Sequence, residues 1–339
     1  MILAGGLSTR LYPLTKQVPK PLVPVAGEPN AVHLMRYLAA SGFDEIAINV
    51  HYLADAIRSA LGDGSRFGVR LEYLHEPVLL GSAGAVKQME AFFSNGTFVV
   101  VGCDDLTDLP LENLLAAHRE RRALATIGLV ERDEVEHYGV VVTDGAGRIT
   151  GFQEKPLKGT ERSKLVNTGI YAFEPEIFED IPAGEFYDFG KDVFPALQGR
   201  GAAFYGFDAR GAYWCDIGTP PEYRRATNDV LSAAFRIPDT RASGADPSAR
   251  IAPDAIVEGD VWIGRNARIE TGARVVGPSV IGNGVRVGAG ATIERSIVWE
   301  NASVGAGAAL RDAIVGIGYQ VADGAALDGA IVAGEPEPV

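Results

Sequence analysis

A six-residue repeat in the last third of the chain constrains the fold more than any other feature of the sequence. Counting in sixes from Ile251, every position as far as Ile293 holds isoleucine or valine. The positions four residues further on are mostly small: Ala255, Val261, Ala267, Ala273, Ser279, Val285, Ala291 and Ile297. One aliphatic and one small inward residue per hexad predict a left-handed parallel β-helix, in which each hexad forms one flat side of a triangular coil. The pattern also predicts a slip of one residue in the register after Trp299, at a corner loop.

The first 228 residues follow a different pattern, in which short β-branched runs alternate with helical stretches. The expected strands are 45–50, 69–74, 97–101 and 125–130, and the expected helices are 31–40, 52–61, 83–93 and 111–122. This alternation predicts βαβ units, and therefore an α/β domain with a mostly parallel sheet and helices on both faces. Two runs that flank Asp144-Gly145-Ala146-Gly147 predict a β-hairpin within 138–153. We expect the α/β domain over 1–228, a connecting helix and linker over 229–250, and the β-helix over 251–339.

Charge and composition narrow the class of partner. Thirty-one basic and 44 acidic residues give a formal net charge of −13, which disfavours nucleic acid or an anionic membrane surface as a partner. No run approaches the roughly 18 apolar residues of a membrane-spanning helix, and the start, MILAGGLSTR, lacks the regions of a signal peptide. Two cysteines in 339 residues argue against a disulfide framework. The expected location is the cytoplasm.

Residues 2–27 contain a glycine turn followed by three cations. Ala4-Gly5-Gly6 precedes Ser8-Thr9-Arg10, and Lys16 and Lys20 follow before the first acidic residue, Glu28. Glycines let backbone N–H groups approach a phosphate without interference from a Cβ atom. Three prolines stiffen the segment that carries Lys20, which lowers the entropy lost when its ammonium group is held against an anion. The segment predicts a polyphosphate site, although it is neither a Walker A loop nor a GxGxxG turn.

Two aspartates at the ends of expected strands predict a metal site. Asp104 follows the apolar run 97–101, and Asp216 follows a second short strand, 213–215. Open α/β sheets bind ligands at the carboxyl ends of their strands, and Mg²⁺ takes one or two protein carboxylates and fills its shell with phosphate oxygens and water. Asp105 is the alternative ligand. Cys103 and Cys215 directly precede the two aspartates, and we expect both as inert, buried thiols.

Taken together, these motifs resemble those of the sugar-1-phosphate nucleotidyltransferases, or NDP-sugar pyrophosphorylases. The resemblance begins with GG-x-x-TRL-x-PLT, PKP and PV-x-G-x-P near the amino terminus and covers most of residues 1–228. The other matching segments are Glu76 with 81–85, then 102–105, 154–156, 167–169 and 214–218. The sequences of residues 167–173 and 188–195 are most similar to those of the mannose-1-phosphate guanylyltransferase branch. The resemblance implies a Rossmann-like nucleotidyltransferase domain, and several branches of the family add a carboxyl-terminal left-handed β-helix.

The family resemblance implies that an NTP and a sugar-1-phosphate give an NDP-sugar and pyrophosphate, with Mg²⁺ as cofactor. A sugar phosphate oxygen would attack the α-phosphorus in line, and positioned cations would offset the repulsion between the two anions. Arg10 would clamp the β- and γ-phosphates, Lys20 would contact the phosphate where the substrates meet, and Lys155 would contact the sugar phosphate. The implied nucleotide-binding residues are Leu3, Ala4, Gly5, Gly6, Ser8, Thr9, Arg10, Glu76 and Gly81. The implied sugar-phosphate-binding residues are Gly139, Glu154, Lys155 and Asn167, and the implied metal ligands are Asp104 and Asp216.

Substrate identity and two other functions stay open at this point. GTP with mannose-1-phosphate or a similar phosphate, a cyclitol phosphate included, is the expected pair. A thymidylyl-, uridylyl- or adenylyltransferase of glucose-1-phosphate is the alternative, as are an inactive regulatory subunit and a nucleotide-sugar sensor of the same fold. Acetyltransferases built on such a β-helix commonly rely on a histidine as general base. All five histidines of this chain lie before residue 138, so an acyltransferase is disfavoured. We expect the β-helix to mediate homo-oligomerisation.

Overall fold

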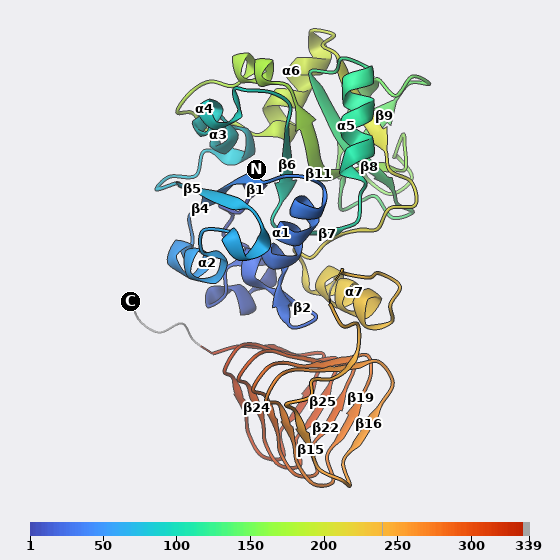
Figure 1. Ribbon diagram of the computed structural model, residues 1–339. Coiled ribbons are helices and arrows are strands. Elements are labelled where there is room, and N and C mark those ends of the chain that lie inside the picture. Colours follow the sequence, from blue (N-terminus) through green and yellow to red (C-terminus); the bar gives the residue numbers. More distant parts are fainter. Residues whose placement is uncertain (239, 335–339) are drawn as a thin grey trace. The chain divides into compact units, whose positions relative to one another are not determined.

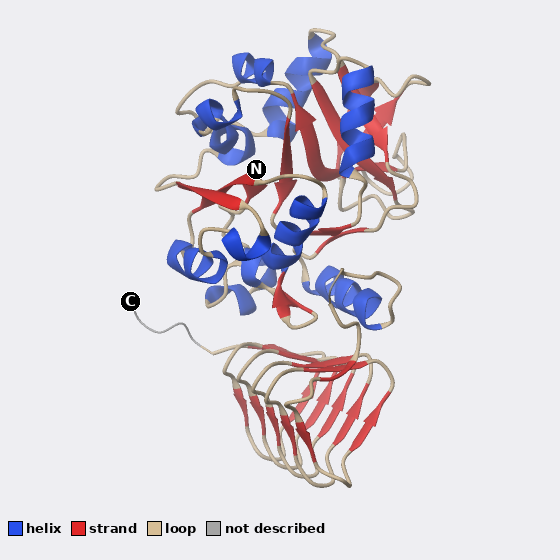
Figure 2. Ribbon diagram, in the orientation of Figure 1, coloured by secondary structure: helices blue, strands red, loops and turns tan. Residues whose placement is uncertain are grey.

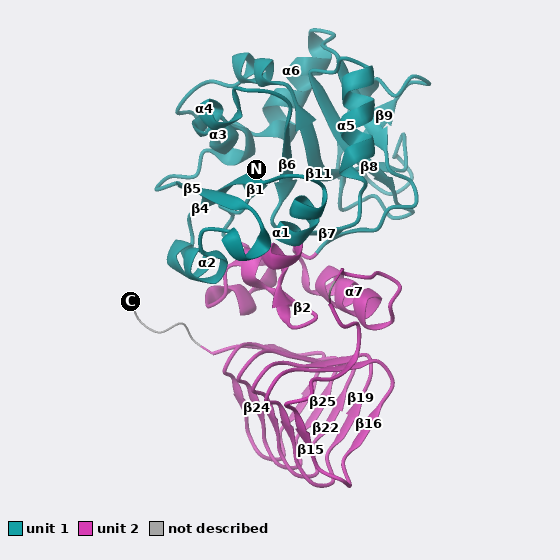
Figure 3. Cartoon of the chain, in the orientation of Figure 1, with its two compact units in different colours: residues 1–7, 34–216 teal, residues 8–33, 217–339 magenta. Residues whose placement is uncertain are grey.

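The computed structural model describes residues 1–238 and 240–334. Residue 239 of the expected linker and residues 335–339 of the expected β-helix lie outside the described residues. The chain divides into two compact units, one of Met1–Leu7 with Leu34–Asp216 and one of Ser8–His33 with Ile217–Val339 (Figure 3). The segment Ser8–His33 therefore groups with the carboxyl-terminal part of the chain. The expected domain boundaries at 228 and 250 stay predictions.

A nine-stranded mixed sheet forms the centre of the first unit (Figures 1 and 2). Its path is β10-β9-β11-β6-β1-β4-β5, and β8 pairs with β11 and with β12. The strands are β1 (Ile2–Leu3), β4 (Glu45–Val50), β5 (Arg70–His75), β6 (Phe98–Gly102), β8 (Ala125–Glu131), β9 (Gly139–Thr143), β10 (Ile149–Glu154), β11 (Leu165–Phe173) and β12 (Phe204–Asp208). β5, β4, β1 and β6 run parallel, whereas β11 runs antiparallel to β6, β8 and β9. The expected strands are confirmed, and the expected hairpin is β9 with β10.

Helices cover both faces of this sheet, as the alternating pattern predicts. They are α1 (Asn30–Ala40), α2 (Ala54–Leu61), α3 (Gly81–Gln88), α4 (Glu90–Phe93), α5 (Leu111–Glu120) and α6 (Phe194–Gly199). On α5, His118 hydrogen-bonds Thr126 of β8, whereas the next residue, Ile127, packs in the cluster that contains α3 and α6 side chains. Successive side chains of a strand point to opposite faces of the sheet, so α5 covers one face and α3 and α6 the other. No helix of the described residues is long and apolar enough to cross a membrane.

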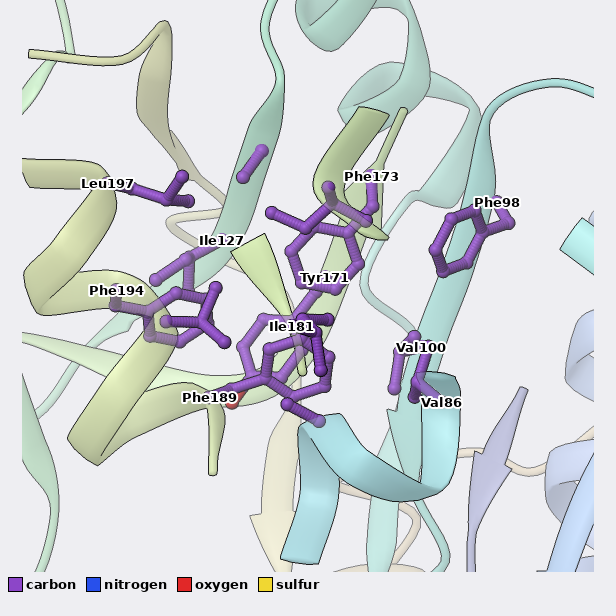
Figure 4. Close-up of a cluster of buried hydrophobic side chains, with 14 of the residues drawn as sticks. Val86, Phe98, Val100, Ile127, Tyr171, Phe173, Ile181, Phe189, Phe194 and Leu197 are labelled. Carbon is purple, nitrogen blue, oxygen red and sulfur yellow. The ribbon is translucent and has the colours of Figure 1, made fainter. Parts of the chain in front are cut away.

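Aromatic side chains fill the face of the sheet beneath α3 and α6 (Figure 4). Phe173 stacks on Phe189 with ring centroids 4.9 Å apart, and Tyr171 meets Phe194 edge-on at 5.2 Å. Large buried rings supply most of the apolar area in such a core, and their offset and edge contacts add to it. Tyr171 and Phe173 belong to β11, so this packing fixes the strand whose amino-terminal half carries Asn167.

Three stacks of short parallel strands form the β-helix of the second unit, in agreement with the hexad pattern (Figure 1). The first stack is β14 (Gly244–Ala245), β17 (Val261–Ile263), β20 (Ser279–Ile281), β23 (Ile297–Val298), β26 (Ile314–Val315) and β29 (Ile331–Val332). The second is β15 (Arg250–Ile251), β18 (Arg268–Ile269), β21 (Arg286–Val287), β24 (Ser303–Val304) and β27 (Gln320–Val321). The third is β16 (Ile256–Glu258), β19 (Arg274–Val276), β22 (Thr292–Glu294), β25 (Ala309–Arg311) and β28 (Ala326–Asp328). The predicted aliphatics from Ile263 to Ile293 line its interior.

The register slip lies earlier than the sequence pattern predicts. Val275 pairs with Ile293, eighteen residues on, but Val280 pairs with Ile297, only seventeen residues on. One residue is therefore missing from the corner between β22 and β23, before Trp299 rather than after it. As a result Val298 points into the interior, and Ile297, which the hexad count predicts to face inward, lies on the outer face of its stack.

Candidate active site

The glycine turn after β1 closes against a buried polar pair. The Ala4 N–H donates to Asn49 Oδ1 at 2.8 Å, and Asn49 Nδ2 donates to Glu76 Oε2 at 2.5 Å. A Cβ atom on Gly5 would lie 2.7 Å from Asn49 Nδ2 and 2.9 Å from Glu76 Oε2. At contacts under 3.0 Å something must shift, so a side chain at position 5 would displace the hydrogen-bonded pair or the turn. The next residue, Gly6, is exposed.

Glu76 lies at the centre of this expected base pocket and is only 1% exposed. Its second oxygen, Oε1, accepts the Leu80 N–H at 3.3 Å. The following residue, Gly81, begins α3 with a φ of +76°, and a Cβ atom there would lie 2.5 Å from the carbonyl oxygen of Tyr187. Glu76 therefore holds the turn before α3 against β4, which supplies Asn49 and pairs with β1, the strand that precedes the glycine turn.

The three cations that follow the glycine turn lie on a chain of short 3₁₀ turns, η1 (Thr9–Leu11), η2 (Leu14–Lys16) and η3 (Lys20–Leu22). Ser8 precedes η1 with a φ of 54°, in the left-handed region that favours glycine. Its carbonyl oxygen accepts the Thr15 hydroxyl at 2.7 Å. Thr9 and Arg10 are exposed, and Lys20 is half-buried. Residues with strained backbone persist only where surrounding contacts hold them in place, and they are found most often at active sites and ligand-binding sites.

Three aspartates meet at the carboxyl end of β6. The short strands β7 (Asp105–Thr107) and β13 (Trp214–Asp216) are antiparallel, and Asp105 lies opposite Asp216. Both oxygens of Asp105 are engaged, one by the Trp214 indole N–H at 2.9 Å and the other by the Gly102 N–H at 3.0 Å. Burial, with the charges of Asp104 and Asp216 as further causes, raises the pKa of Asp105 well above its usual value.

Exposure to solvent distinguishes Asp105 from the two expected metal ligands. Asp105 is 3% exposed, whereas Asp104 and Asp216 are both half-buried and accessible. A buried carboxyl whose oxygens both accept hydrogen bonds is a poor ligand for a hard cation, which needs oxygens it can approach. Cys103 and Cys215 are buried, as predicted.

The acidic cluster and the glycine turn lie at neighbouring strand ends. β1 pairs with β6 in parallel, with Leu3 opposite Gly102. The Cys103 N–H donates to the Leu3 carbonyl at 3.1 Å, so the two chains stay paired where they leave the sheet. Leu3–Gly6 and the acidic cluster thus follow neighbouring parallel strands at one edge of the sheet, the edge at which α/β folds bind ligands.

The residues expected at the sugar phosphate gather on β9, β10 and β11. Gly139 lies opposite Glu154 in the hairpin, and a Cβ atom on Gly139 would lie 3.4 Å from Glu154 Oε2 and 3.8 Å from the Asn167 Cβ. Lys155 has a φ of 45°, and its ammonium group lies 3.7 Å from Glu154 Oε1 with both side chains well exposed. An ion pair this exposed contributes little to stability, so its charges are available to a ligand.

Asn167 connects this group to the acidic cluster. Its Oδ1 accepts the Gly169 N–H at 2.9 Å, and its Nδ2 donates to the Tyr171 hydroxyl at 3.1 Å. A Cβ atom on Gly169, whose φ is +80°, would lie 3.5 Å from Asp105 Oδ2. The sequence analysis missed the parts played by Asn49, Tyr171 and Trp214. The signal for Asn49 is a single amide among the apolar residues that follow Glu45 in the strand Glu45–Val50.

The candidate residues fall in both compact units. Ser8, Thr9, Arg10 and Lys20 belong to the second unit, and the others belong to the first: Leu3, Ala4, Gly5, Gly6, Glu76, Gly81, Asp104, Gly139, Glu154, Lys155, Asn167 and Asp216. Within the described residues, no group of three or more His, Cys, Asp or Glu side chains is arranged to hold a metal ion. Two carboxylates are nevertheless sufficient for Mg²⁺ when a substrate supplies phosphate oxygens.

Comparisons with known proteins agree with this architecture. A family model described as nucleotidyl transferase matches residues 1–233, and a bacterial transferase hexapeptide model of six repeats matches residues 260–295. A UTP–glucose-1-phosphate uridylyltransferase of Synechocystis sp. is 41% identical over 320 residues, which cover 88% of this chain and 82% of that protein. A mannose-1-phosphate guanylyltransferase of Mycobacterium tuberculosis is 35% identical over 300 residues, which cover 87% and 82%.

A solved structure, that of HddC from Yersinia pseudotuberculosis, shares the fold. It matches with a TM-score of 0.59 and 30% sequence identity, and the match covers 67% of this chain and 96% of that one. The family model spans well over half of the chain, and the first two relatives are matched over most of their length. The chain therefore belongs to the family of sugar-1-phosphate nucleotidyltransferases.

Proposed function

We propose that this enzyme transfers a guanylyl group from GTP to mannose-1-phosphate or a closely similar sugar-like phosphate and releases pyrophosphate. The observation that carries the proposal is the shared sheet edge, where Leu3 before the glycine turn pairs with Gly102 before the acidic cluster. A triphosphate that lies over the glycine turn then has its α-phosphorus near the carboxylates. The second support is the number of mannose-1-phosphate guanylyltransferases among the relatives, with identities of 32–35%.

Members of this family generally use a divalent metal ion, and we propose Mg²⁺ held by Asp104 and Asp216. When bound, the ion offsets negative charge on the phosphates and on the pyrophosphate leaving group. The chain's own contribution is to hold the two carboxylates at adjoining strand ends. Asp105 serves this purpose, because its hydrogen bonds to the Trp214 indole and the Gly102 N–H join β13 and β6.

The cations of the site then act on the triphosphate and the sugar phosphate. Arg10 donates to the β- and γ-phosphates and later to pyrophosphate, a task that suits a planar group with several donors that does not deprotonate. Lys20 lies at the phosphate where the two substrates meet, and Lys155 binds the sugar phosphate. Bringing two anions together in the right orientation is the main source of rate enhancement in such a displacement.

We assign the sugar and base contacts to the residues that the family resemblance implies. Glu154 and Asn167 hydrogen-bond sugar hydroxyls, and Gly139 lets the sugar lie close to the backbone. Gly6, with Ser8 and Thr9, cradles the phosphates through backbone N–H groups. Leu3, Ala4, Gly5, Glu76 and Gly81 line the base pocket.

A second substrate pair, UTP with glucose-1-phosphate, is favoured by one specific finding. The relative with 41% identity is a UTP–glucose-1-phosphate uridylyltransferase that matches over most of both chains. The two pairs differ in the base, a purine or a pyrimidine, and in the configuration at one sugar carbon, so the same phosphate-binding and metal-binding residues serve either pair.

We also propose that the enzyme forms a homo-oligomer through the β-helix. The first coil leaves Ile251, Ile256 and Val257 exposed, and β15 and β16 are the outer strands of their stacks. Apolar residues next to unpaired strand edges favour association with another copy. Sedimentation of the full chain and of an Ile256→Asp variant tests this proposal. We expect a loss of association in the variant.

One matrix of assays tests the proposed function. Pyrophosphate release is measured with GTP, UTP, ATP, CTP and dTTP against mannose-1-phosphate, glucose-1-phosphate and a cyclitol-1-phosphate, with Mg²⁺ and with EDTA. We expect the highest rate with GTP and mannose-1-phosphate and a loss of activity in EDTA. A preference for UTP and glucose-1-phosphate would select the second pair, and full activity in EDTA would remove the metal proposal.

A further inference from the structure

One outer face of the β-helix is apolar and buried, unlike the neighbouring face. On the four middle strands of the first stack the outward residues are Trp262, Val280, Ile297 and Ile314, and none of these four is more than 8% exposed. The outward residues of the second stack begin with Arg250, Arg268 and Arg286, which are all exposed. Within the second unit, the first stack is covered by the segment 18–29 and by α7 (Pro220–Leu231), which line a common cavity with it.

Trp262 packs directly against the hairpin that follows Lys20. The hairpin joins β2 (Pro24–Val25) to β3 (Glu28–Pro29), and Gly27 in its turn has a φ of +77°. A Cβ atom on Gly27 would lie 2.0 Å from the Trp262 ring. The indole therefore occupies the space of a side chain at position 27.

A buried tyrosine connects the same face of the β-helix to the hairpin. Tyr223 of α7 is 0% exposed, and its hydroxyl donates to the Pro24 carbonyl at 2.7 Å. The same hydroxyl accepts the Trp299 indole N–H at 2.9 Å, and the two rings meet edge-on at 6.2 Å. Each donor and acceptor in this chain of bonds is paired, and removing one member leaves a buried polar group without its partner.

The position of Pro24 affects the position of the turn that carries Lys20. The Val23 N–H donates to the Lys20 carbonyl at 3.1 Å and closes η3, and the Asn30 N–H donates to the Val23 carbonyl at 3.0 Å. Pro24 is the next residue, so the Tyr223 hydroxyl bonds the chain one residue beyond the turn that carries Lys20.

Apolar packing alone does not fix this contact. A pocket of about 100 Å³, partly open to solvent, lies between the segment and the β-helix, and its lining includes Leu22, Pro24, Tyr223, Val280, Ile297 and Trp299. Because the segment and the β-helix are not in close apolar contact along this pocket, the hydrogen bonds through Tyr223 have more influence on where the segment lies than they would in a close-packed interface.

We propose that Tyr223 and Trp299 are positioning residues for Lys20, so that the β-helix supports the phosphate-binding segment as well as any assembly. This inference rests on the proposed function for Lys20. Misplacing a catalytic cation by about 1 Å can cost on the order of a hundredfold in rate, and loss of the Tyr223 hydroxyl frees Pro24 to move while keeping the aromatic ring.

The test compares Tyr223→Phe and Trp299→Phe with Val287→Ala in the full chain. Val287 is fully buried inside the β-helix, so its truncation destabilises the β-helix without altering the Tyr223 hydrogen bonds. We expect Tyr223→Phe to lower kcat at least about tenfold with little change in sugar-phosphate KM, while Val287→Ala lowers Tm and keeps kcat. Trp299→Phe acts in the same direction, and the double variant is no worse than Tyr223→Phe because the residues form one chain of bonds.

Amide hydrogen exchange supplies a readout that does not depend on activity. In Tyr223→Phe we expect faster exchange at Leu22, Val23 and Asn30, whose N–H groups close the turn and the hairpin, and no such change in Val287→Ala. Unchanged exchange at these amides, or an equal loss of kcat in both variants, would overturn the inference. An enzyme without nucleotidyl transfer would contradict the proposed function instead, and the exchange data would still decide whether the support exists.

Discussion

Asp216 lies directly opposite Asp105 across the antiparallel pair of β13 and β7, and Asp104 is the residue that precedes Asp105. Three carboxyl groups within one strand end would repel one another if all were ionised. The fold reduces this repulsion by burying Asp105, since burial raises the pKa of its carboxyl group well above the usual value and so favours the neutral form. The two remaining aspartates are the accessible ones, and they form the proposed metal site.

Replacing Asp104 by asparagine should lower turnover by two or more orders of magnitude, since it removes one of two anionic ligands. Thermal unfolding should stay close to that of the wild type because Asp104 is half-buried and accessible. The matched control is Asp208→Asn, at a partly exposed acid that pairs with Arg210 and does not belong to the acidic cluster. Near-normal turnover in Asp104→Asn would reassign the ligand to Asp105.

Gly5→Ala should weaken nucleotide binding. The new methyl group would lie within 3 Å of Asn49 Nδ2 and Glu76 Oε2, so the glycine turn or the buried pair must shift. We expect the KM for the NTP to rise at least about tenfold, with a smaller change in the KM for the sugar phosphate. Gly145→Ala is the control, because a Cβ atom there has no neighbour within 4 Å. Equal nucleotide KM values in the two variants would argue against a nucleotide site at this turn.

Lys155→Ala should raise the KM for the sugar-1-phosphate and leave the KM for the NTP nearly unchanged. Its ammonium group is exposed and makes only a long ion pair with Glu154, so its loss should not alter Tm. Lys158→Ala is a close control, since Lys158 is also exposed and lies near Glu136 at 4.0 Å. Initial rates over both substrate concentrations separate the two KM values, and a selective effect on the NTP would contradict the role assigned to Lys155.

Stability should fall as the pH drops below about 6.5, partly through His118. Burial lowers the pKa of His118 and outweighs the opposite effect of Glu174, whose Oε1 lies 3.1 Å from Nε2. The unfolded chain therefore binds more protons at this site than the folded chain, and the free energy of unfolding decreases as the pH falls through the usual histidine range. In denaturant titrations at pH 7.5 and 5.5, we expect a smaller loss for His118→Gln than for the wild type. An equal loss would exclude His118 as a source.

The sequence predicts the features that depend on local periodicity. Strand 45–50 and the hairpin formed by β9 and β10 follow from runs of β-branched residues and turn residues, and the β-helix follows from the hexads. The corner between Ile293 and Ile297 escapes this reasoning because Val298 and Trp299 are both apolar. Either residue could continue the inward series, and only the strand pairing decides between them.

The sequence predicts the charged residues of the candidate site but not the residues that hold them in place. Asp104 and Lys155 are recognisable in the sequence because each is a charged residue that follows a predicted strand or hairpin. The contact between Asn49 and Glu76 joins residues 27 positions apart, and the contact between Tyr223 and Trp299 joins residues 76 positions apart. Such pairs leave no local period in the sequence. The contact of Trp262 with the hairpin at Gly27 is a further example, since the sequence shows that Trp262 is apolar but does not show which segment covers it.

The most direct measurement is a crystal structure of the enzyme with a non-hydrolysable nucleoside triphosphate analogue and Mg²⁺. We expect the triphosphate over the glycine turn at Gly5 and Gly6, Arg10 at the β- and γ-phosphates, and Mg²⁺ bound to carboxylate oxygens of Asp104 and Asp216. A triphosphate bound away from that turn, or a metal ion that contacts neither aspartate, would contradict the proposed site.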